Sequence, residues 1–421
     1  MSSKTLETAF SNFQQSLPER ARLYVAGGSG EPLPLVETLR SAPDLASGVT
    51  FLGIWVPGIN QTDWASLHPT AKAESTFVSS ALRPSFDAGR TRFLPLSYTQ
   101  SAAWLSQTPL DAAVVMISPP DATGMVSLGV SVDFSPLILD RPDVRIMGII
   151  NQQLKAPING PKFSVERFDT IVEADHPLAS VAENDLPQTY SQIGTHIAGL
   201  CSDGDTLQFG LGNVQQAVLK ALHNHRNLKL HGGMISTPLA ALIDQGAIAG
   251  GPGAITTGVA IGTPDFYERA AMDGRIRYAP ATHTHDIPTL AQLPNFKAIN
   301  SCIEVDLFGQ ANAEFINGRQ ISGTGGLSDF LRGAAGSPTG RGILALTSTA
   351  RNGSISRIVP RLPRDATSIP RTDVDTIVTE HGVAELKYKS IDARAEALIA
   401  IADPSYRDQL ASDWREIRKN L

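Results

Sequence analysis

Short apolar runs alternate with amphipathic stretches along most of the chain. The runs are rich in valine, isoleucine and leucine, and they predict strands at Arg22–Ala26, Val49–Trp55, Ala112–Ser118, Val144–Ile150, Thr170–Glu173 and Thr206–Phe209. Continuous apolar runs are typical of strands that are covered on both faces, as in a parallel sheet between layers of helices. The sequence therefore predicts an α/β fold with mostly parallel sheets.

The amphipathic stretches between these runs have apolar residues at helical spacing. They predict one helix over residues 1–21 and another over Tyr190–Leu200. A last helix is expected to begin at Asp403-Pro404, because aspartate is a good N-cap and proline suits the first helical position.

A polar, proline-bearing stretch at residues 176–189 separates two halves of similar pattern. In each half a buried strand is followed by a glycine three residues before a serine, in MISPPDATGMVS and in TSTARNGSIS. We therefore expect two related α/β domains, at residues 1–180 and 186–421, that could derive from a duplication.

Composition excludes several classes of partner. The 421 residues carry 35 basic and 41 acidic side chains, a formal charge of −6 with no basic stripe, so neither nucleic acid nor an anionic membrane is an expected partner. No secretory signal opens the chain, and no apolar run is long enough to span a bilayer. Cys201 and Cys302 lie among apolar or small residues, so we expect reduced core thiols and a cytoplasmic protein.

Two glycine-rich segments are candidates for binding an anion. Gly210–Asn213 lies between a strand and a helix, where free N–H groups and the helix dipole favour phosphate, although an ordinary strand-to-helix turn has the same pattern. The turn lacks G-x-G-x-x-G, which disfavours a dinucleotide. The segment Ala298–Pro360 combines strand-like runs with Gly323, Gly325 and Gly326, a composition that suits a backbone-lined cleft.

Histidines and carboxylates are the candidates for chemistry. His283 and His285 are two residues apart, so on a strand they would share one face and could bind a metal, as in a metal-dependent hydrolase. The spacing brings no further ligand to them, and we expect no metal. Glu31 and Glu304 could each act as a nucleophile or a general base. In the alternative, Glu31 only stabilises the N–H groups of a local turn, and Glu304 only pairs with Arg319 or Arg332.

Several long motifs resemble the acetyl-CoA hydrolase/transferase family, which includes 4-hydroxybutyrate and succinate CoA-transferases. They are GLGNVQQAVL, NSCIEVDLFGQANAEFINGRQISGTGGLSDFLRGA, STARNGSISRIVP, DVDTIVTEHGVAEL and RAEALIAIADPSYRDQL, with looser matches at GGSGEP and ISPPDATGMVSLGVSVD. The resemblance implies two CoA-transferase-type α/β domains in a homodimer. It implies acyl-CoA and a small carboxylate as substrates, with no permanently bound cofactor.

The resemblance also assigns binding residues in the second half of the chain. By it, the CoA site is lined by Gly210, Leu211, Gly212, Asn213 and Val214. Ser322 and Gly326 lie where the family places its glycine-rich segment against the acyl-CoA. Ser354 occupies a position where relatives often have a lysine near CoA, so one positive contact is expected to be missing.

The family's chemistry uses a glutamate that attacks the thioester, and the position that matches it here is Gly233 in LHGGMI. A glycine cannot form that covalent intermediate. His285 lies where relatives have an asparagine that donates to an oxyanion, a role that an imidazole can take. We expect a CoA-transferase with a displaced nucleophile, Glu31 or Glu304. The alternatives are an acyl-CoA hydrolase in which His285 or a carboxylate activates water, and a CoA-binding protein without catalysis.

Overall fold

The computed structural model describes residues 3–181, 185–363 and 367–421. Part of the predicted linker, residues 182–184, therefore lies outside the described residues. The chain packs into two units, of which the first contains Met1–Ala182, Gly233–Thr237 and Gly251–Thr284 and the second contains Glu183–Gly232, Pro238–Gly250 and His285–Leu421. A segment from the second half of the sequence thus packs with the first half, which an apolar pattern does not reveal.

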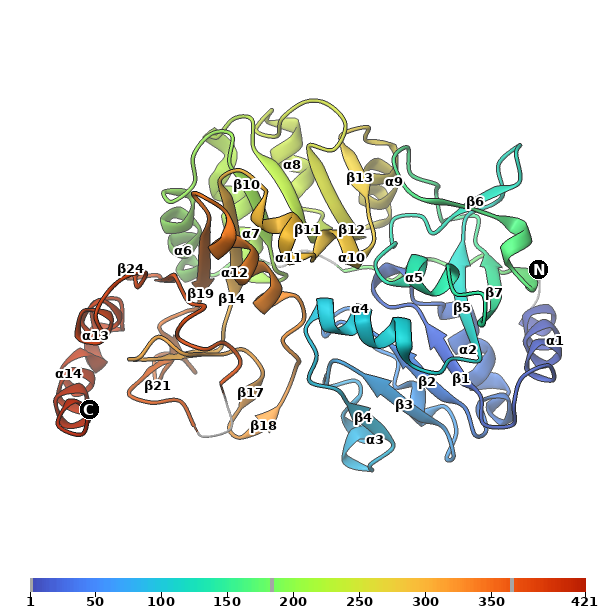
Figure 1. Cartoon of the computed structure of the whole chain (residues 1–421), viewed down its shortest axis with the longest axis horizontal. Coiled ribbons are helices and arrows are strands. Elements are labelled where there is room, and N and C mark those ends of the chain that lie inside the picture. The colour runs from blue at the N-terminus through green and yellow to red at the C-terminus, as the bar shows by residue number, and fades with distance from the viewer. Residues whose placement is uncertain (1–2, 182–184, 364–366) are drawn as a thin grey trace. The chain divides into compact units, whose positions relative to one another are not determined.

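Among the described residues, seven parallel strands form the first sheet, in the order β4-β3-β2-β1-β5-β7-β9 (Figure 1). They are β1 (Arg22–Val25), β2 (Thr50–Gly53), β3 (Lys72–Ser75), β4 (Thr91–Phe93), β5 (Ala112–Ile117), β7 (Arg145–Ile150) and β9 (Thr170–Glu173). Each predicted strand of this half is present, and their buried side chains form one core with those of the flanking helices. A parallel sheet with helices is the α/β fold that the apolar runs predicted.

The helices of the first 182 residues are short. They are α1 (Ser3–Gln14), α2 (Leu33–Ser41), α3 (Arg83–Asp87), α4 (Tyr98–Gln107) and α5 (Ser135–Leu139). The prediction of one helix over residues 1–21 was too long, because α1 ends at Gln14, just before Pro18, which has no N–H to donate. Phe10 and Phe13 on α1 are buried in the core as the helical spacing predicted.

Eight described strands form the second sheet, in the order β13-β12-β11-β10-β14-β19-β23-β24. They are β10 (Thr206–Phe209), β11 (Lys229–Ser236), β12 (Ile255–Ile261), β13 (Ile276–Tyr278), β14 (Phe296–Ser301), β19 (Arg341–Ala345), β23 (Thr376–Thr379) and β24 (Gly382–Glu385). The pairs recorded within this sheet are parallel except β23 with β24. The mostly parallel α/β fold is confirmed.

Helices of the second half follow the same alternation. They are α6 (Gln188–Ala198), α7 (Asn213–Ala221), α8 (Leu239–Asp244), α9 (Pro264–Met272), α10 (Ala281–Thr284), α11 (Ile287–Ala291), α12 (Leu327–Gly336), α13 (Ile391–Ala400) and α14 (Pro404–Arg418). Asp403 caps α14 as predicted, because its carboxylate accepts a hydrogen bond from the Ser405 N–H at 2.9 Å.

The strand expected around His283 is absent. His283 lies in α10, where its N–H and that of Thr284 both donate to the Pro280 carbonyl. Asp286 then caps α11 through the Thr289 N–H at 2.9 Å. His283 and His285 therefore do not share one face of a strand, which was the arrangement that the disfavoured metal alternative required.

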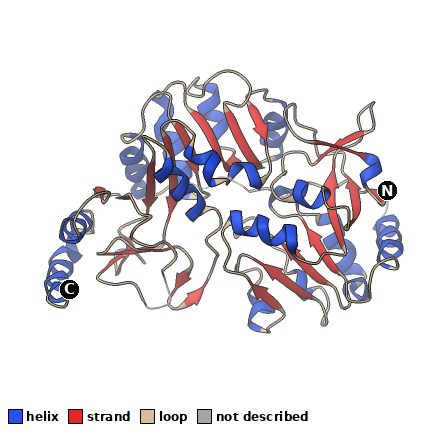
Figure 2. Ribbon diagram, viewed as in Figure 1, coloured by secondary structure: helices blue, strands red, loops and turns tan. Residues whose placement is uncertain are grey.

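The segment between β14 and β23 contains mostly loops with short strands (Figure 2). Its short strands are β15 (Glu304–Asp306), β16 (Ala311–Asn312), β17 (Phe315–Ile316), β18 (Arg319–Gln320), β20 (Thr349–Ala350), β21 (Ile355–Ser356) and β22 (Ile358–Val359). A further short pair, in the first half of the chain, is β6 (Met125–Ser127) with β8 (Lys162–Ser164). Such loop-rich segments on a rigid sheet are common places for binding residues.

Both sheets reverse their strand order at one place, between β1 and β5 in the first and between β10 and β14 in the second. In open α/β sheets, ligands bind outside the carboxyl ends of the strands at such a switch point. Both cysteines are buried free thiols, as predicted. Within the described residues, we find no helix with the length and apolar character needed to cross a membrane.

Candidate functional site

A cavity of about 260 Å³ lies at the switch point of the second sheet. It is formed where β10, β14 and β19 end and where α7 begins. Its lining residues are Tyr190, Gly212, Asn213, Val214, Ser301, Cys302, Ala345, Leu346, Thr347 and Arg357. The carboxyl ends of three parallel strands therefore meet around one hollow, which is the arrangement that binds nucleotides in many α/β proteins.

The polar groups of this cavity suit an anion. Gly212 precedes α7 with φ +100° and ψ −162°, a conformation that is open almost only to glycine. A Cβ added to Gly212 would meet nothing within 4 Å, so the space beside this residue, where α7 begins, is open. The guanidinium of Arg357 adds a positive charge, and no described carboxylate forms an ion pair with it. Helix dipole and cation together favour a phosphate.

The predicted turn residues lie at this cavity or beside it. Gly212, Asn213 and Val214 are among its lining residues. Gly210 packs against Asn300, whose Oδ1 would lie 3.2 Å from a Cβ on that glycine. Leu211, the next residue, is half-buried. Gly210, Leu211 and Gly212 therefore form the turn after β10, and Asn213 and Val214 begin α7.

A reciprocal amide pair holds β10 to β14 at the switch point. Asn300 Nδ2 donates to Gln208 Oε1 at 2.8 Å, and Gln208 Nε2 donates to Asn300 Oδ1 at 3.2 Å. Both side chains are buried, so each satisfies the polar atoms of the other. The pair fixes the position of the Gly210 turn relative to the neighbouring strand.

Ser354 is not among the residues that line the cavity. It is exposed, and its hydroxyl donates to the Arg351 carbonyl at 2.9 Å. Arg357, three residues later, supplies the cation that seemed to be missing, and sequence reasoning did not identify it. The only signal was a basic residue just after the ARNGSIS motif. Its orientation depends on β21 and β22, which no apolar pattern predicts.

His285 and Gly326 are brought together, although 41 positions separate their numbers in the sequence. A Cβ on Gly326 would lie 2.4 Å from His285 Cδ2, so only glycine fits beside the imidazole. The ring also packs on Phe330, with centroids 4.5 Å apart. Burial, together with the neighbouring His231, lowers the pKa of His285 to about 3. The imidazole is therefore neutral at pH 7 and can donate an N–H.

Ser322 begins the glycine-rich segment that leads to Gly326. Its hydroxyl donates to the Gly323 carbonyl at 3.2 Å, and its own carbonyl accepts from Gln320 Nε2 at 2.6 Å. The segment then forms the N-terminus of α12, where Gly326 is the N-cap residue. These contacts are local, so they shape the loop without using its remaining N–H groups.

The two predicted carboxylates lie in different units of the fold. Glu304 on β15 accepts a hydrogen bond from Asn312 Nδ2 at 3.1 Å, while Arg332, one arginine expected to pair with it, bonds Asp373 instead. Glu31 is buried after the loop that follows β1, where its Oε2 accepts from Asn60 Nδ2 at 3.0 Å. Burial raises the pKa of Glu31. The two carboxylates therefore have separate local amide partners.

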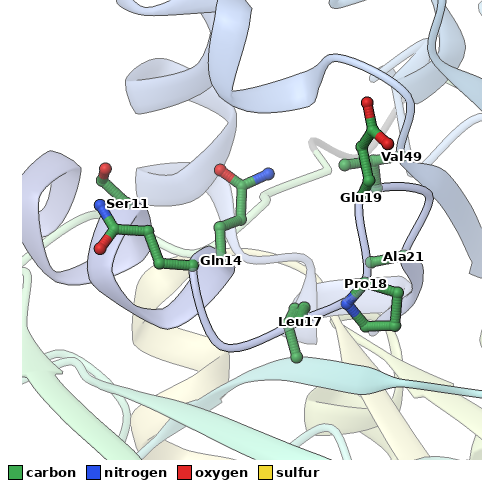
Figure 3. A pocket seen from close by; sticks show the side chains of 8 residues that line it. Ser11, Gln14, Leu17, Pro18, Glu19, Ala21 and Val49 are labelled. Atoms are coloured by element: carbon green, nitrogen blue, oxygen red, sulfur yellow. The ribbon is translucent and has the colours of Figure 1, made fainter.

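Two other hollows differ from the α7 cavity. A hollow of about 320 Å³ is lined by Arg20, Lys72 and Arg90, but it lies where β2 and β3 begin and not at the carboxyl ends of the strands. The other, of about 250 Å³, lies between α1 and the start of β1, and its charged lining residue is the acidic Glu19 (Figure 3). It contains no basic side chain and would repel phosphate. Among the described residues, no group of three or more histidine, cysteine, aspartate or glutamate side chains could hold a metal ion.

Comparisons with known proteins agree with this geometry. Residues 7–181 match the acetyl-CoA hydrolase/transferase N-terminal domain, and residues 262–414 match the C-terminal domain of the same name. The chain is 32% identical to the 4-hydroxybutyrate coenzyme A transferase of Clostridium kluyveri over 98% of its own length and 97% of that protein. It is also 32% identical to the succinyl-CoA:cyclohexane-1-carboxylate CoA transferase of Geobacter metallireducens, over 83% of this chain and 82% of the relative.

A solved structure is similar along the whole length. The crystal structure of RipA from Yersinia pestis superposes with a TM-score of 0.87 at 26% identity, covering 99% of this chain and 100% of that one.

Proposed function

Because the chain belongs to the acetyl-CoA hydrolase/transferase family, we propose that it transfers CoA from a small acyl-CoA to a carboxylate. The acyl donor is acetyl-CoA or a short hydroxy- or dicarboxylic acyl-CoA. CoA is a substrate here, and no resident cofactor takes part.

The cavity at the N-terminus of α7 is the observation that carries this proposal. CoA is an anion with several phosphates, and the cavity offers helix N–H groups together with the Arg357 guanidinium. Thr347 and Ser301 add hydroxyls to the same lining. We assign the phosphate end of CoA to this cavity, with Gly210–Val214 as its backbone contact.

The segment Ser322–Gly326 and His285 are assigned to the acyl end of CoA. A neutral imidazole that is buried beside a glycine is well suited to donate an N–H to a developing oxyanion, because it needs no change of protonation at neutral pH. Gly326 leaves room for that ring, which explains why a side chain is absent from this position.

The nucleophile cannot come from Gly233. The sequence proposes Glu31 and Glu304 for this role, and both stay candidates here. In each, one carboxylate oxygen accepts a hydrogen bond from an asparagine amide. For the carboxylate to attack, this hydrogen bond would have to break, or it would have to hold the other oxygen in the attacking orientation.

Acyl-CoA hydrolysis is the second candidate, and the absence of a side chain at Gly233 favours it because water could occupy that space. His285 is a poor choice for the base in this reaction. With a pKa of about 3 it would accept a proton from water only weakly at neutral pH. Hydrolysis would therefore need a carboxylate base.

One assay separates the functions. The protein is incubated with a panel of acyl-CoAs, with and without acetate, succinate and 4-hydroxybutyrate, and CoA products are quantified. We expect new acyl-CoA only when an acceptor is present. Free CoA without acceptor would instead indicate a hydrolase. Tight CoA binding without turnover in either assay would contradict both activities.

The resemblance further predicts a homodimer, and the two cysteines predict a cytoplasmic protein; both remain predictions. Light scattering coupled to size-exclusion chromatography of the full chain would give the mass of the assembly. A monomer at micromolar concentration would contradict the dimer.

A further inference from the structure

Asp133 has an unusual position for a carboxylate. It follows Val132 in the segment between β6 and α5, and it has a positive φ of 37°, which is uncommon outside glycine and asparagine. The Val132 N–H donates to the Gly258 carbonyl at 2.9 Å, and the Ala281 N–H donates to the Asp133 carbonyl at 2.9 Å. Backbone contacts from β12 and α10 therefore fix this residue in place.

One oxygen of the Asp133 carboxylate has no recorded contact in the described part of the chain that would stabilise the fold. Its Oδ1 is buried and has no hydrogen-bond partner among the described residues, although the residue as a whole keeps some exposure. Structural carboxylates in such places are normally paired or hydrogen-bonded, because an unpaired buried charge is costly. A buried carboxylate oxygen without a hydrogen-bond partner, in a group whose pKa is shifted, is a common property of a functional residue.

Two tyrosines are the titratable neighbours that the structure records for Asp133. They are Tyr24 on β1 and Tyr98 on α4, and burial raises the pKa of both, with a smaller contribution from the Asp133 charge. Neither is a cation that would stabilise the carboxylate. Burial accordingly raises the pKa of Asp133 to about 7, so an ionised, reactive form is present at neutral pH.

Asp133 lies close to Gly233. A Cβ placed on Gly258 of β12 would be 3.6 Å from Asp133 Oδ1 and 3.0 Å from the Gly233 carbonyl oxygen, so both atoms are close to one point. Gly233 and His231 are two residues apart on β11 and therefore share a face of that strand. A carboxylate from another segment thus lies near the backbone of β11 at a position that has no side chain of its own.

We propose that Asp133 is the nucleophile of this protein and that its carboxylate acts at the place where Gly233 has no side chain. The inference rests on the proposed CoA transfer and names the residue that performs it. It differs from the roles suggested for Glu31 and Glu304 in the place from which the carboxylate acts. Glu31 Oε1 is likewise buried without a recorded partner among the described residues, but it is Asp133 Oδ1 that is recorded close to the Gly233 backbone.

The reaction balances without any further reactant. A carboxylate oxygen of Asp133 attacks the acyl carbonyl, the C–S bond breaks, and CoA leaves as a thiolate. The thiolate then attacks the Asp133 carbonyl carbon of the mixed anhydride, which releases the donor acid as a carboxylate and leaves an aspartyl-CoA thioester. An acceptor carboxylate repeats the two steps in reverse order and takes CoA. No proton is transferred.

Trapping the intermediate tests the inference without any mutation. The full-length protein is mixed with acetyl-CoA or succinyl-CoA in the absence of acceptor, quenched with hydroxylamine, digested and analysed by mass spectrometry. We expect a hydroxamate on Asp133 that forms only when acyl-CoA is present. A hydroxamate on Glu31 or Glu304, or none at all during turnover, would overturn the inference.

Variants give a second readout. D133N is nearly isosteric, and asparagine tolerates positive φ well, so it should fold. We expect D133N to lose about a thousandfold or more in kcat with CoA affinity unchanged, and D133E to restore part of it. D143N is the matched control, because Asp143 pairs with Arg141 at an exposed site, and it should keep full activity.

The outcomes distinguish failure of the inference from failure of the proposed function. Transfer in the wild type together with normal kcat in D133N would remove Asp133 and leave the transferase function. No transfer in the wild type would remove the function. In that case a hydroxamate on Asp133 would still support its role as nucleophile, and its absence would contradict both.

Discussion

The two sheets have the same strand order around their switch points but differ in what fills them. After β1, the loop that begins at Gly27 is packed against other segments of its unit: a Cβ on Gly27 would lie 1.9 Å from the Ile54 carbonyl oxygen. After β10, a Cβ on Gly212 would meet nothing within 4 Å, and the cavity of about 260 Å³ begins there. The same topology therefore produced a closed switch point and an open one.

The closed switch point has specific contacts. Asn60 Oδ1 accepts from the Gly28 N–H at 3.0 Å, and the Ser29 hydroxyl donates to the Ala260 carbonyl on β12 at 2.9 Å. These bonds occupy groups that a phosphate would need. Fold alone thus does not identify a nucleotide site, because the loop after β1 has more glycines than the loop after β10 but its polar groups are bonded to other parts of the protein.

Replacing the loop glycines by alanine tests this comparison and gives the largest expected effect. Gly27→Ala should lower the free energy of unfolding by about 3–5 kcal/mol, because its Cβ would overlap a backbone oxygen. Gly212→Ala should cost about 1–3 kcal/mol from backbone strain alone. Urea unfolding of both variants measures the difference. Equal losses would mean that the two loops are packed alike.

The pH dependence of stability should differ between wild type and D133N. The raised pKa of Asp133 means that the folded state holds its proton more tightly than the unfolded chain, so this carboxyl destabilises the fold increasingly from about pH 4 to pH 7. D133N should therefore be more stable than wild type by a few kcal/mol at pH 8 and nearly equal at pH 4. Thermal unfolding across this range would show it, and a constant difference would contradict the shift.

Removing the cation of the open switch point should weaken CoA binding. Arg357→Gln should raise the Kd of CoA about 10- to 100-fold, as expected for loss of a charge-assisted hydrogen bond of about 1.5–3 kcal/mol. Isothermal calorimetry provides the measurement. Arg341→Gln is the control: Arg341 is at the opposite end of β19 and pairs with Glu385, so its loss should leave the Kd unchanged.

The smallest effect is expected from adding a charge at Ser354. Ser354→Lys restores the residue type that relatives often have, but the position is exposed and outside the cavity lining. We expect at most about a fivefold decrease in the Kd of CoA, which should disappear at high salt because exposed charges are screened. A much larger gain would mean that CoA extends over this loop.

The strands could be predicted from the sequence because each is a run of consecutive apolar residues, and such a run has to be buried. Thr206–Phe209 was predicted to the residue, and the turn after it was assigned to CoA by the family resemblance. The positions of exposed charges and the conformations of loops leave no comparable pattern in the sequence. The sequence therefore did not reveal that Pro280 begins a helical turn at His283, which rules out the strand considered for His283 and His285.

The sequence by itself determined the α/β class, the buried strands, the glycine turn after β10 and the family, because these depend on short stretches of neighbouring residues. Tertiary structure alone decided which switch point is open, that Arg357 lines it, and that Gly326 fits the ring of His285. It also placed Asp133 near Gly233. Each of these is a contact between residues far apart in the chain, and such contacts form only when the packed core has fixed the strand order.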